Sequence, residues 1–375
     1  MSTTTVPAGG ALHQVVSEGV SIWLDDLSRD LIGSGELARL ITERSVVGVT
    51  TNPTIFAGAL RSGGSYDAAL QTLAAANVGV EDAVFRITTD DVREACDVLA
   101  PIHRKVGHGD GRVSIEVDPR LARDAAGTLK SARELWWAVD RPNLYIKIPA
   151  TVEGLAAITQ ALSEGISVNV TLIFSVERYA AVLDAFMRGL EGAREAGRDL
   201  STIASVASFF VSRVDTEIDG RLEAQGGSAR ELKGTAAVAN ARLAFALYLE
   251  TVASTRWQAL ADAGAQPQRP LWASTGVKDP NYPDTLYVDE LVARGVVNTM
   301  PRATLEALAD HGRPHGDTLN GTAEQSRAQL AKLQGAGIDI AEVTDLLEQE
   351  GLVKFERSWQ ELLDTVEGGL RNAQK

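Results

Sequence analysis

The amino-acid sequence predicts an α/β protein, specifically a closed (β/α)8 barrel (TIM barrel) with additional C-terminal helices. Eight short runs rich in β-branched residues recur along the 375 residues, and stretches with helical periodicity separate them. Alternating strands and helices form parallel βαβ units, so eight such units favour closure into a barrel. An open doubly wound sheet is the alternative. The sequence shows no glycine-rich dinucleotide fingerprint after the first run, which argues against it.

The eight predicted strands share a short length and an enrichment in β-branched residues. They cover residues 21–26, 46–52, 112–118, 143–149, 166–171, 203–210, 270–275 and 295–301. Residues 177–190 are typical of the helices between them, because apolar side chains recur there at three- and four-residue spacing. The same spacing over residues 345–370 predicts a long C-terminal helix that packs outside the barrel or covers one end.

The domain organisation follows from these patterns. Residues 1–10 are rich in Ser, Thr, Pro and Gly and predict a flexible tail, and residues 11–375 form a single barrel domain. Within it, residues 302–375 are mainly helices packed on the barrel. Residues 221–235 indicate a loop-rich insertion. His311 and His315 are four apart, but glycines and a proline surround them, so we expect an exposed loop and no metal site.

Composition and charge argue against several classes of function. With 36 Lys and Arg against 50 Asp and Glu, the net charge of −14 disfavours non-specific nucleic-acid binding. We expect no transmembrane helix and no signal peptide, because the sequence has neither a long apolar run nor a basic N-terminal region before an apolar one. The single cysteine, Cys96, excludes an intrachain disulfide and fits a reducing cytoplasm. Its helical spacing with Leu99 predicts a small core residue.

Side-chain parity along the strands predicts a polar barrel interior near the strand ends. Residues two apart in a strand face the same way, so Glu116 and Lys147 oppose the apolar, branched side chains of their own strands. The inward-facing polar set is Asp25, Asn52, Glu116, Lys147, Asn169, Thr171 and Ser208. A network of mutually satisfied structural groups is the alternative. Six consecutive strands contribute, however, and catalytic residues of this fold sit at the C-terminal strand ends.

Lys147 is the candidate nucleophile. It lies among apolar and aromatic neighbours, and burial of a lysine lowers its pKa and yields a free amine that can attack a carbonyl group. Two alternatives are a lysine at a strand end that reaches water, and an ion pair with Glu116 that keeps the amine charged.

The other polar residues suit the remaining steps of Schiff-base chemistry. Asp25 is the candidate base for C–C cleavage, and Glu116 is a candidate proton shuttle that acts with Thr171 and a water. The amides of Asn52 and Asn169 can hold substrate hydroxyls without adding charge. Asp25 has the alternative of capping a helix. Asn52, which precedes Pro53, has the alternative of forming an Asx-turn.

Two cations follow late strands and are candidates for binding phosphate. Arg213 lies five residues beyond Ser208, and Lys278 follows the seventh predicted strand. A solvated surface charge is the alternative for each.

Four motifs, in this order, resemble transaldolase. They are residues 48–53 (GVTTNP), 114–118 (SIEVD), 145–149 (YIKIP) and 167–172 (SVNVTL), and the resemblance runs from about residue 21 to 305. The chain length and the long C-terminal helices are similar to the longer bacterial and plant-like branch. The resemblance implies a TIM barrel and cofactor-free, metal-free chemistry. It also implies transfer of a dihydroxyacetone unit from sedoheptulose 7-phosphate to glyceraldehyde 3-phosphate. The products would be erythrose 4-phosphate and fructose 6-phosphate, in the non-oxidative pentose phosphate pathway.

The resemblance also implies roles for individual residues. Lys147 forms the Schiff base, Asp25 is the acid/base, and Glu116 with Thr171 relays protons through water. Asn52, Asn169 and Ser208 match substrate-binding positions, and Arg213 matches a phosphate-binding arginine. The chain departs from the family pattern in two places. The tripeptide Ser208-Phe209-Phe210 stands where Ser-Pro-Phe is common, and Lys278 stands where a second phosphate-binding arginine is common.

Three functions are compatible with these residues. The first is transaldolase activity on phosphorylated sugars, in a cytoplasmic monomer or homodimer. The second is an aldolase of similar fold that releases free dihydroxyacetone. The third is a sugar-phosphate-binding protein without turnover, and the complete Lys147, Glu116 and Asp25 set argues against it.

Overall fold

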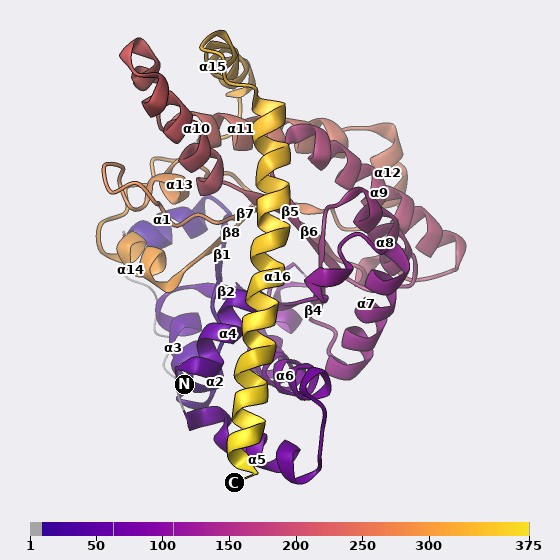
Figure 1. Cartoon of the computed structure of the whole chain (residues 1–375). Coiled ribbons are helices and arrows are strands. Elements are labelled where there is room, and N and C mark those ends of the chain that lie inside the picture. The colour runs from indigo at the N-terminus through magenta and orange to yellow at the C-terminus, as the bar shows by residue number, and fades with distance from the viewer. Residues whose placement is uncertain (1–9, 63, 108, 375) are drawn as a thin grey trace.

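Eight parallel strands, hydrogen-bonded in sequence order, close into a barrel surrounded by helices (Figure 1). The structure is a computed structural model that describes residues 10–62, 64–107 and 109–374. The predicted tail therefore lies outside the described residues, apart from Gly10. The predicted fold class, a TIM barrel, is confirmed.

Each predicted strand overlaps one observed strand. The strands are β1 (Ser21–Leu24), β2 (Val46–Val49), β3 (Arg112–Glu116), β4 (Leu144–Pro149), β5 (Val168–Ile173), β6 (Ser205–Phe210), β7 (Arg269–Ala273) and β8 (Val297–Met300). Five predicted strands ran too far at their C-terminal ends, and in the first three of them Asp25, Asn52 and Asp118 therefore lie beyond the observed strands. Asn52 shows the reason, because its side chain already caps the next helix.

Helices precede, separate and follow the strands, and most of them cover the outside of the barrel. They are α1 (Ala11–Ser17), α2 (Arg29–Gly33), α3 (Glu36–Glu43), α4 (Pro53–Arg61), α5 (Asp67–Ala75), α6 (Val80–Val106), α7 (Ala125–Val139), α8 (Val152–Ser163), α9 (Val176–Glu195), α10 (Ser212–Gln225), α11 (Ala236–Val252), α12 (Thr255–Ala261), α13 (Leu286–Asp289), α14 (Arg302–His311), α15 (Ala323–Gly335) and α16 (Ile340–Ala373). Short 3-10 segments cover Gly64–Tyr66, Pro119–Leu121, Leu200–Thr202 and Gly227–Leu232. Cys96 is buried in α6, as predicted.

Two local predictions are wrong. Residues 221–235 are not mainly loop, because α10 continues to Gln225 and a 3-10 segment follows; Leu222 is fully buried and holds this polar helix to the core. His311 is the last residue of α14 rather than part of a loop, and only His315 lies beyond the helix. Both histidine side chains are exposed.

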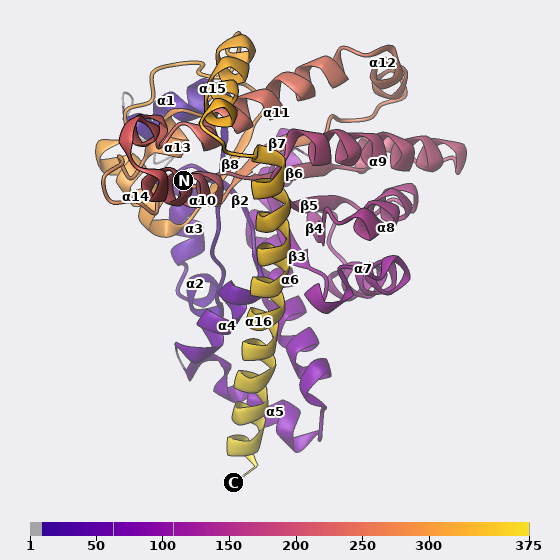
Figure 2. The ribbon, with the colours of Figure 1, turned by 45° about the horizontal axis from the view of Figure 1, so that its top comes forward.

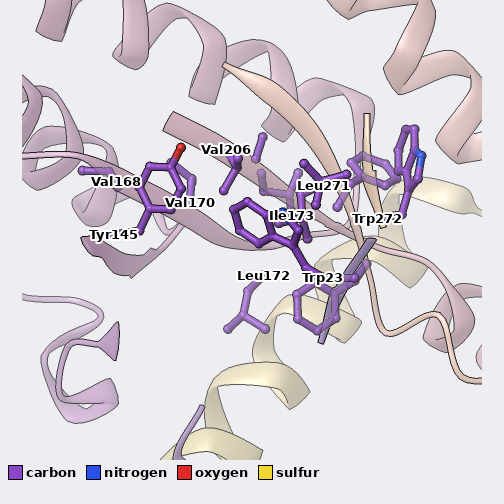
Figure 3. Close-up of a cluster of buried hydrophobic side chains, with 14 of the residues drawn as sticks. Trp23, Tyr145, Val168, Val170, Leu172, Ile173, Val206, Leu271 and Trp272 are labelled. Carbon is purple, nitrogen blue, oxygen red and sulfur yellow. The ribbon is translucent and has the colours of Figure 1, made fainter. Parts of the chain in front are cut away.

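The N-terminal half of the barrel interior is filled by large side chains. Trp23 of β1 stacks on Tyr145 of β4, with ring centroids 6.1 Å apart; β1 and β4 are not neighbours, so this contact crosses the interior. Arg112 lies 4.8 Å from the centre of the Tyr145 ring. Asp110 accepts hydrogen bonds from Trp23 Nε1 at 2.9 Å and from Arg269 Nη1 at 3.1 Å. Figure 3 shows part of the hydrophobic core around Trp23. This end is packed for stability, so space for a ligand remains at the opposite end.

The long helix α16 crosses the C-terminal mouth of the barrel. In Figures 1 and 2 the yellow helix passes in front of the strands in both orientations. It packs against α4, α5, α6 and α10 and touches β5. Ser358 of α16 and Thr54 of α4 share a hydrogen bond of 2.8 Å. The helix therefore forms a roof over the strand ends rather than a coat on the outer wall.

Over the residues that the structure describes, no single helix has the length and apolar character needed to cross a membrane. Helices α11 and α12 together meet that criterion by length and composition, although they are bent by 69° relative to each other.

The first prediction concerns Gly48 of β2, which faces the Trp23 ring. A Cβ atom at this position would lie 2.5 Å from two ring carbons, and the ring is held by its stack on Tyr145. We expect Gly48→Ala to lower the free energy of unfolding by about 1–3 kcal/mol, because the core cannot relax around the added atom. Urea denaturation followed by circular dichroism measures this change.

Gly58→Ala in α4 is the matched control. A Cβ there has no neighbour within 4 Å, so the change should be neutral or stabilise the protein by about 0.5–1 kcal/mol. A Gly48→Ala protein as stable as the Gly58→Ala protein would contradict the described packing.

Candidate active site

Strand register places the central polar residues side by side. Glu116 of β3 pairs with Lys147 of β4, and Lys147 pairs in turn with Asn169 of β5. Two residues further along the same strands, Pro149 of β4 pairs with Thr171 of β5. Glu116, Lys147 and Thr171 lie in the C-terminal halves of their strands, whereas Asn169 lies near the start of β5. The predicted inward-facing set is thus brought together on adjacent strands.

Lys147 is buried in a mixed environment. Only 5% of its side chain is exposed, and its Nζ donates a hydrogen bond of 3.0 Å to the carbonyl oxygen of Thr51. Nζ also lies 5.7 Å from the centre of the Phe355 ring, which α16 places over the barrel mouth. The side chain therefore does not reach solvent, and the alternative of a lysine that extends to water is wrong.

Glu116 lies beside Lys147 and is equally enclosed. Its Oε2 is 3.5 Å from Lys147 Nζ, with 2% of the carboxylate side chain exposed. This distance exceeds the 2.7–2.9 Å that is usual for a hydrogen bond between an ammonium and a carboxylate. Burial raises the pKa of Glu116 to about 7, and the nearby Lys147 charge opposes that rise. The contact is therefore a loose one, in which the carboxyl group can hold or release a proton near neutral pH.

Glu116 and Thr171 have further capacity for hydrogen bonds. Both carboxyl oxygens of Glu116 and the hydroxyl of Thr171 are buried and have no hydrogen-bond partner within the described ranges 10–62, 64–107 and 109–374. Buried polar atoms are nearly always satisfied, if necessary by an ordered water. Their burial suits groups that exchange a proton through a small molecule in the barrel.

Asp25 follows β1 and is held by Thr50, which follows β2 and is itself in contact with Thr299 of β8. The Thr50 hydroxyl donates to Asp25 Oδ1 at 2.7 Å, and it lies 2.7 Å from the hydroxyl of Thr299. Asp25 does not cap the next helix, because Ser28 does so through Leu31 N. The carboxylate is therefore oriented by side chains and not used by the backbone.

Asn52 does bond to the backbone, but as a helix N-cap rather than through the Asx-turn given as the alternative. Its Oδ1 accepts from Ile55 N at 3.1 Å and caps α4. The side-chain NH2 donates no hydrogen bond to any described residue and remains available to a ligand. Capping and substrate binding are therefore compatible, since they use opposite ends of the amide.

Asn169 is fixed in a short chain of hydrogen bonds. Its Nδ2 donates to Ser114 Oγ at 3.0 Å, and Ser208 Oγ donates to its Oδ1 at 2.7 Å. Asn169 is fully buried, whereas Ser208 reaches the cavity described next. Asn169 thus orients Ser208, which lines the cavity.

A cavity of about 220 Å³ opens at the C-terminal mouth of the barrel beside α16. Six of the nine predicted site residues line it: Asp25, Asn52, Lys147, Ser208, Arg213 and Lys278. Glu116, Asn169 and Thr171 lie deeper in the barrel wall. A larger cavity of about 350 Å³, lined in part by Trp359 of α16, also touches Asn52 and Glu116, but it does not reach Lys147. We therefore place the chemistry in the smaller cavity.

The sequence analysis missed several residues of this cavity. Thr50 and Thr299 hold Asp25, and Lys354 and Phe355 enter from α16. Thr50 could have been predicted as an inward-facing residue, because it lies two residues before Asn52 in the predicted strand and shares its parity. Lys354 and Phe355 had none, because helical spacing shows which residues share a face but not what the face covers.

Comparisons with known proteins agree with the geometry. A family model described as Transaldolase/Fructose-6-phosphate aldolase matches residues 22–366. A protein named Transaldolase from Thermobifida fusca (strain YX) is 62% identical over 96% of this chain and 98% of its own length. The chain belongs to the transaldolase/fructose-6-phosphate aldolase family. Proteins named Transaldolase from Acidothermus cellulolyticus and Mycolicibacterium smegmatis are 59% and 60% identical, each over 97% of this chain and 98% of their own length. The resemblance inferred from the four motifs is confirmed.

The second prediction follows from the raised pKa of Glu116. Its ordinary value is 4.5 and its value in the folded protein is about 7, so between these pH values the folded state binds more protons than the unfolded state. Stability must therefore fall as pH rises through this window, by about 3 kcal/mol at most from this group. We expect Glu116→Gln, which cannot ionise, to lose this part of the pH dependence.

Thermal midpoints of the two proteins, measured from about pH 5 to about pH 8, check this prediction. The midpoint of Glu116→Gln minus that of the unchanged protein should grow with pH. Parallel curves would mean that Glu116 titrates in the folded protein as it does in the unfolded chain.

Proposed function

We propose that this chain is a transaldolase that uses Lys147 as its Schiff-base nucleophile, without metal or organic cofactor. The reaction moves a dihydroxyacetone unit from sedoheptulose 7-phosphate to glyceraldehyde 3-phosphate and gives erythrose 4-phosphate and fructose 6-phosphate. The observation that carries this proposal is the buried Lys147 amine, 3.5 Å from a Glu116 carboxyl group whose pKa is about 7. Identity near 60% to proteins named Transaldolase supports the same reaction.

The first step joins the lysine to the ketose. The neutral Lys147 amine attacks the ketone carbon, the C–N bond forms, and the carbonyl oxygen takes up a proton to give a carbinolamine. The hydroxyl then leaves as water, which requires another proton. Glu116 is positioned to move these protons, with a water held between its carboxyl group and the Thr171 hydroxyl. The product is an iminium ion, which can accept the electron pair of the adjacent C–C bond.

The second step breaks that bond. Asp25 accepts the proton of the hydroxyl on the far carbon of the bond, an aldehyde is released, and the electron pair moves to the iminium nitrogen to leave an enamine. An acceptor aldehyde then enters, the new C–C bond forms by the reverse of the same steps, and water releases the product ketose from Lys147. Asn52 and Ser208 hold the hydroxyls of the three-carbon unit.

The arrangement of α16 favours transfer over release. The helix crosses the mouth of the barrel and places Phe355 over Lys147. An apolar ring above the nitrogen limits the access of water to an enamine, which must survive until the acceptor binds. The alternative activity, release of free dihydroxyacetone, requires water to protonate the enamine sooner.

Arg213 is the proposed principal phosphate ligand. It lines the cavity, and its guanidinium carbon lies 5.3 Å from the centre of the Phe210 ring. Burial lowers the pKa of Arg213, as expected for a cation held without a carboxylate partner. Lys278 lines the same cavity and adds a second charge.

The proposed setting is the cytoplasm, with phosphorylated sugars as the binding partners. The net charge of −14 and the single buried cysteine support a reducing compartment and argue against nucleic acid or a membrane as partner. The chain acts as a monomer or a homodimer in this proposal.

The third prediction separates transfer from simple cleavage. With fructose 6-phosphate alone, we expect little free dihydroxyacetone. Adding erythrose 4-phosphate should start steady formation of glyceraldehyde 3-phosphate. Coupled dehydrogenase assays measure both products, and Lys147→Met should form neither. Equal release of dihydroxyacetone with and without acceptor would indicate an aldolase. Thermal stabilisation by fructose 6-phosphate without any product would indicate a binding protein.

The fourth prediction assigns Asp25 to the cleavage step. Asp25→Asn keeps an oxygen for the Thr50 hydrogen bond but cannot accept a proton, so we expect the transfer rate to fall about 10²–10⁴-fold. Borohydride treatment in the presence of fructose 6-phosphate should still inactivate the Asp25→Asn protein, because Schiff-base formation does not need this carboxylate. Asp26→Asn is the matched control, since Asp26 lies outside the cavity lining. If borohydride no longer inactivated the Asp25→Asn protein, Asp25 would instead act in Schiff-base formation.

A further inference from the structure

We propose that Lys354, on the C-terminal helix α16, is a third ligand of the substrate phosphate, together with Arg213 and Lys278. The inference rests on the proposed function for the identity of the substrate. It assigns part of the phosphate site to a helix outside the eight βα units. It also gives α16 a role in specificity, because an unphosphorylated sugar cannot use these charges.

The geometry of α16 brings Lys354 to the correct place. Gly351 packs against the phosphate side of the cavity: a Cβ atom there would lie 3.0 Å from Leu172 Cδ2 and 3.6 Å from Arg213 Nη1. One helical turn later, Phe355 lies over Lys147. Residues three and four apart share a helix face, so Lys354 faces the same region as Gly351. Its side chain lines the cavity that Arg213 and Lys278 also line.

The charges around this part of the cavity are not compensated by the protein. Within the described parts of the chain, Arg213, Lys278 and Lys354 have no carboxylate within 4.0 Å, although many surface cations of this acidic chain do. The negative charge of Glu350 acts on Arg213 and partly opposes the effect of burial on its pKa. Burial lowers the pKa of Lys354, and the positive charges of Arg213 and Lys278 lower it further. Three cations that repel one another around a cavity favour binding of a dianion.

The chemistry of lysine explains why a third cation is useful here. A single lysine is a point charge and cannot replace the two parallel hydrogen bonds of an arginine. Lys278 stands where the family often has an arginine. A second lysine on a different element would contact the phosphate from another direction, replace the lost hydrogen bond and add a further charge. Arg213 from α10, Lys278 after β7 and Lys354 from α16 would then surround the group.

The test compares Lys354→Met with Arg357→Met. Arg357 lies on the same helix with 82% of its side chain exposed, so its loss changes the net charge equally but not the cavity. We expect Lys354→Met to weaken binding of inorganic phosphate and of fructose 6-phosphate about tenfold, as measured by titration calorimetry. Arg357→Met should stay within about twofold of the unchanged protein, and Lys354→Arg should restore most of the affinity.

Kinetics add an independent readout. For Lys354→Met, the KM for fructose 6-phosphate should rise about tenfold while kcat changes less than about twofold, since the side chain touches no reacting atom. Equal dissociation constants for Lys354→Met and Arg357→Met would overturn the proposal, and so would a fall in kcat alone. Lys354 is only partly buried, at the rim of the cavity, so the thermal midpoints of the two variants should match. If they do not, Lys354→Gln, which keeps a polar end, repeats the comparison.

Failure of this inference is distinguishable from failure of the proposed function. Calorimetry with phosphate needs no turnover, so it tests Lys354 even in a protein that transfers nothing. Conversely, normal transfer activity with unchanged phosphate affinity in Lys354→Met would leave the transaldolase assignment intact and remove only Lys354 from the site.

Discussion

The shared burial of Lys147 and Glu116 is the constraint on which the rest of the site depends. An amine and a carboxyl group placed 3.5 Å apart inside a barrel are costly to ionise separately and do not form a short ion pair. Burial therefore raises the pKa of Glu116 to about 7, so that this carboxyl group can take up or release a proton near neutral pH. The fold supplies this arrangement directly, because the parallel register of β3 and β4 fixes the two side chains as neighbours.

The two ends of the barrel divide stability from chemistry. At the N-terminal end, Trp23, Tyr145 and Arg112 fill the interior, and Asp110 links Trp23 to Arg269. Near the C-terminal end, β3 and β4 carry Glu116 and Lys147, and a cavity lined by Lys147, Ser208 and Phe355 of α16 leaves space for a ligand. The closely packed N-terminal end of the barrel holds the strands in register, so the polar groups at the other end need little reorganisation when a substrate binds.

Strand parity made most of this site predictable from the sequence. A period of two assigns each side chain to the interior or the wall, which correctly placed Lys147, Glu116 and Ser208 without any knowledge of distances. Parity cannot show how far a strand extends, so Asp25 and Asn52 were placed in strands although they lie in the loops beyond. Parity also cannot show whether a side-chain amide will hydrogen-bond to the backbone, as the oxygen of Asn52 does when it caps α4. The contribution of α16 was not predictable, because the path of a C-terminal helix over a barrel depends on contacts between segments hundreds of residues apart, such as Thr54 with Ser358.

The central claim is that Lys147 forms the covalent intermediate. Reduction with borohydride in the presence of fructose 6-phosphate, followed by proteolysis and mass spectrometry, tests it directly. The account predicts a three-carbon dihydroxyacetone adduct on the peptide that contains Lys147, with the remainder of the sugar already released. An adduct on any other lysine, or no adduct in a protein shown to be folded, would contradict the assignment of Lys147 as the nucleophile.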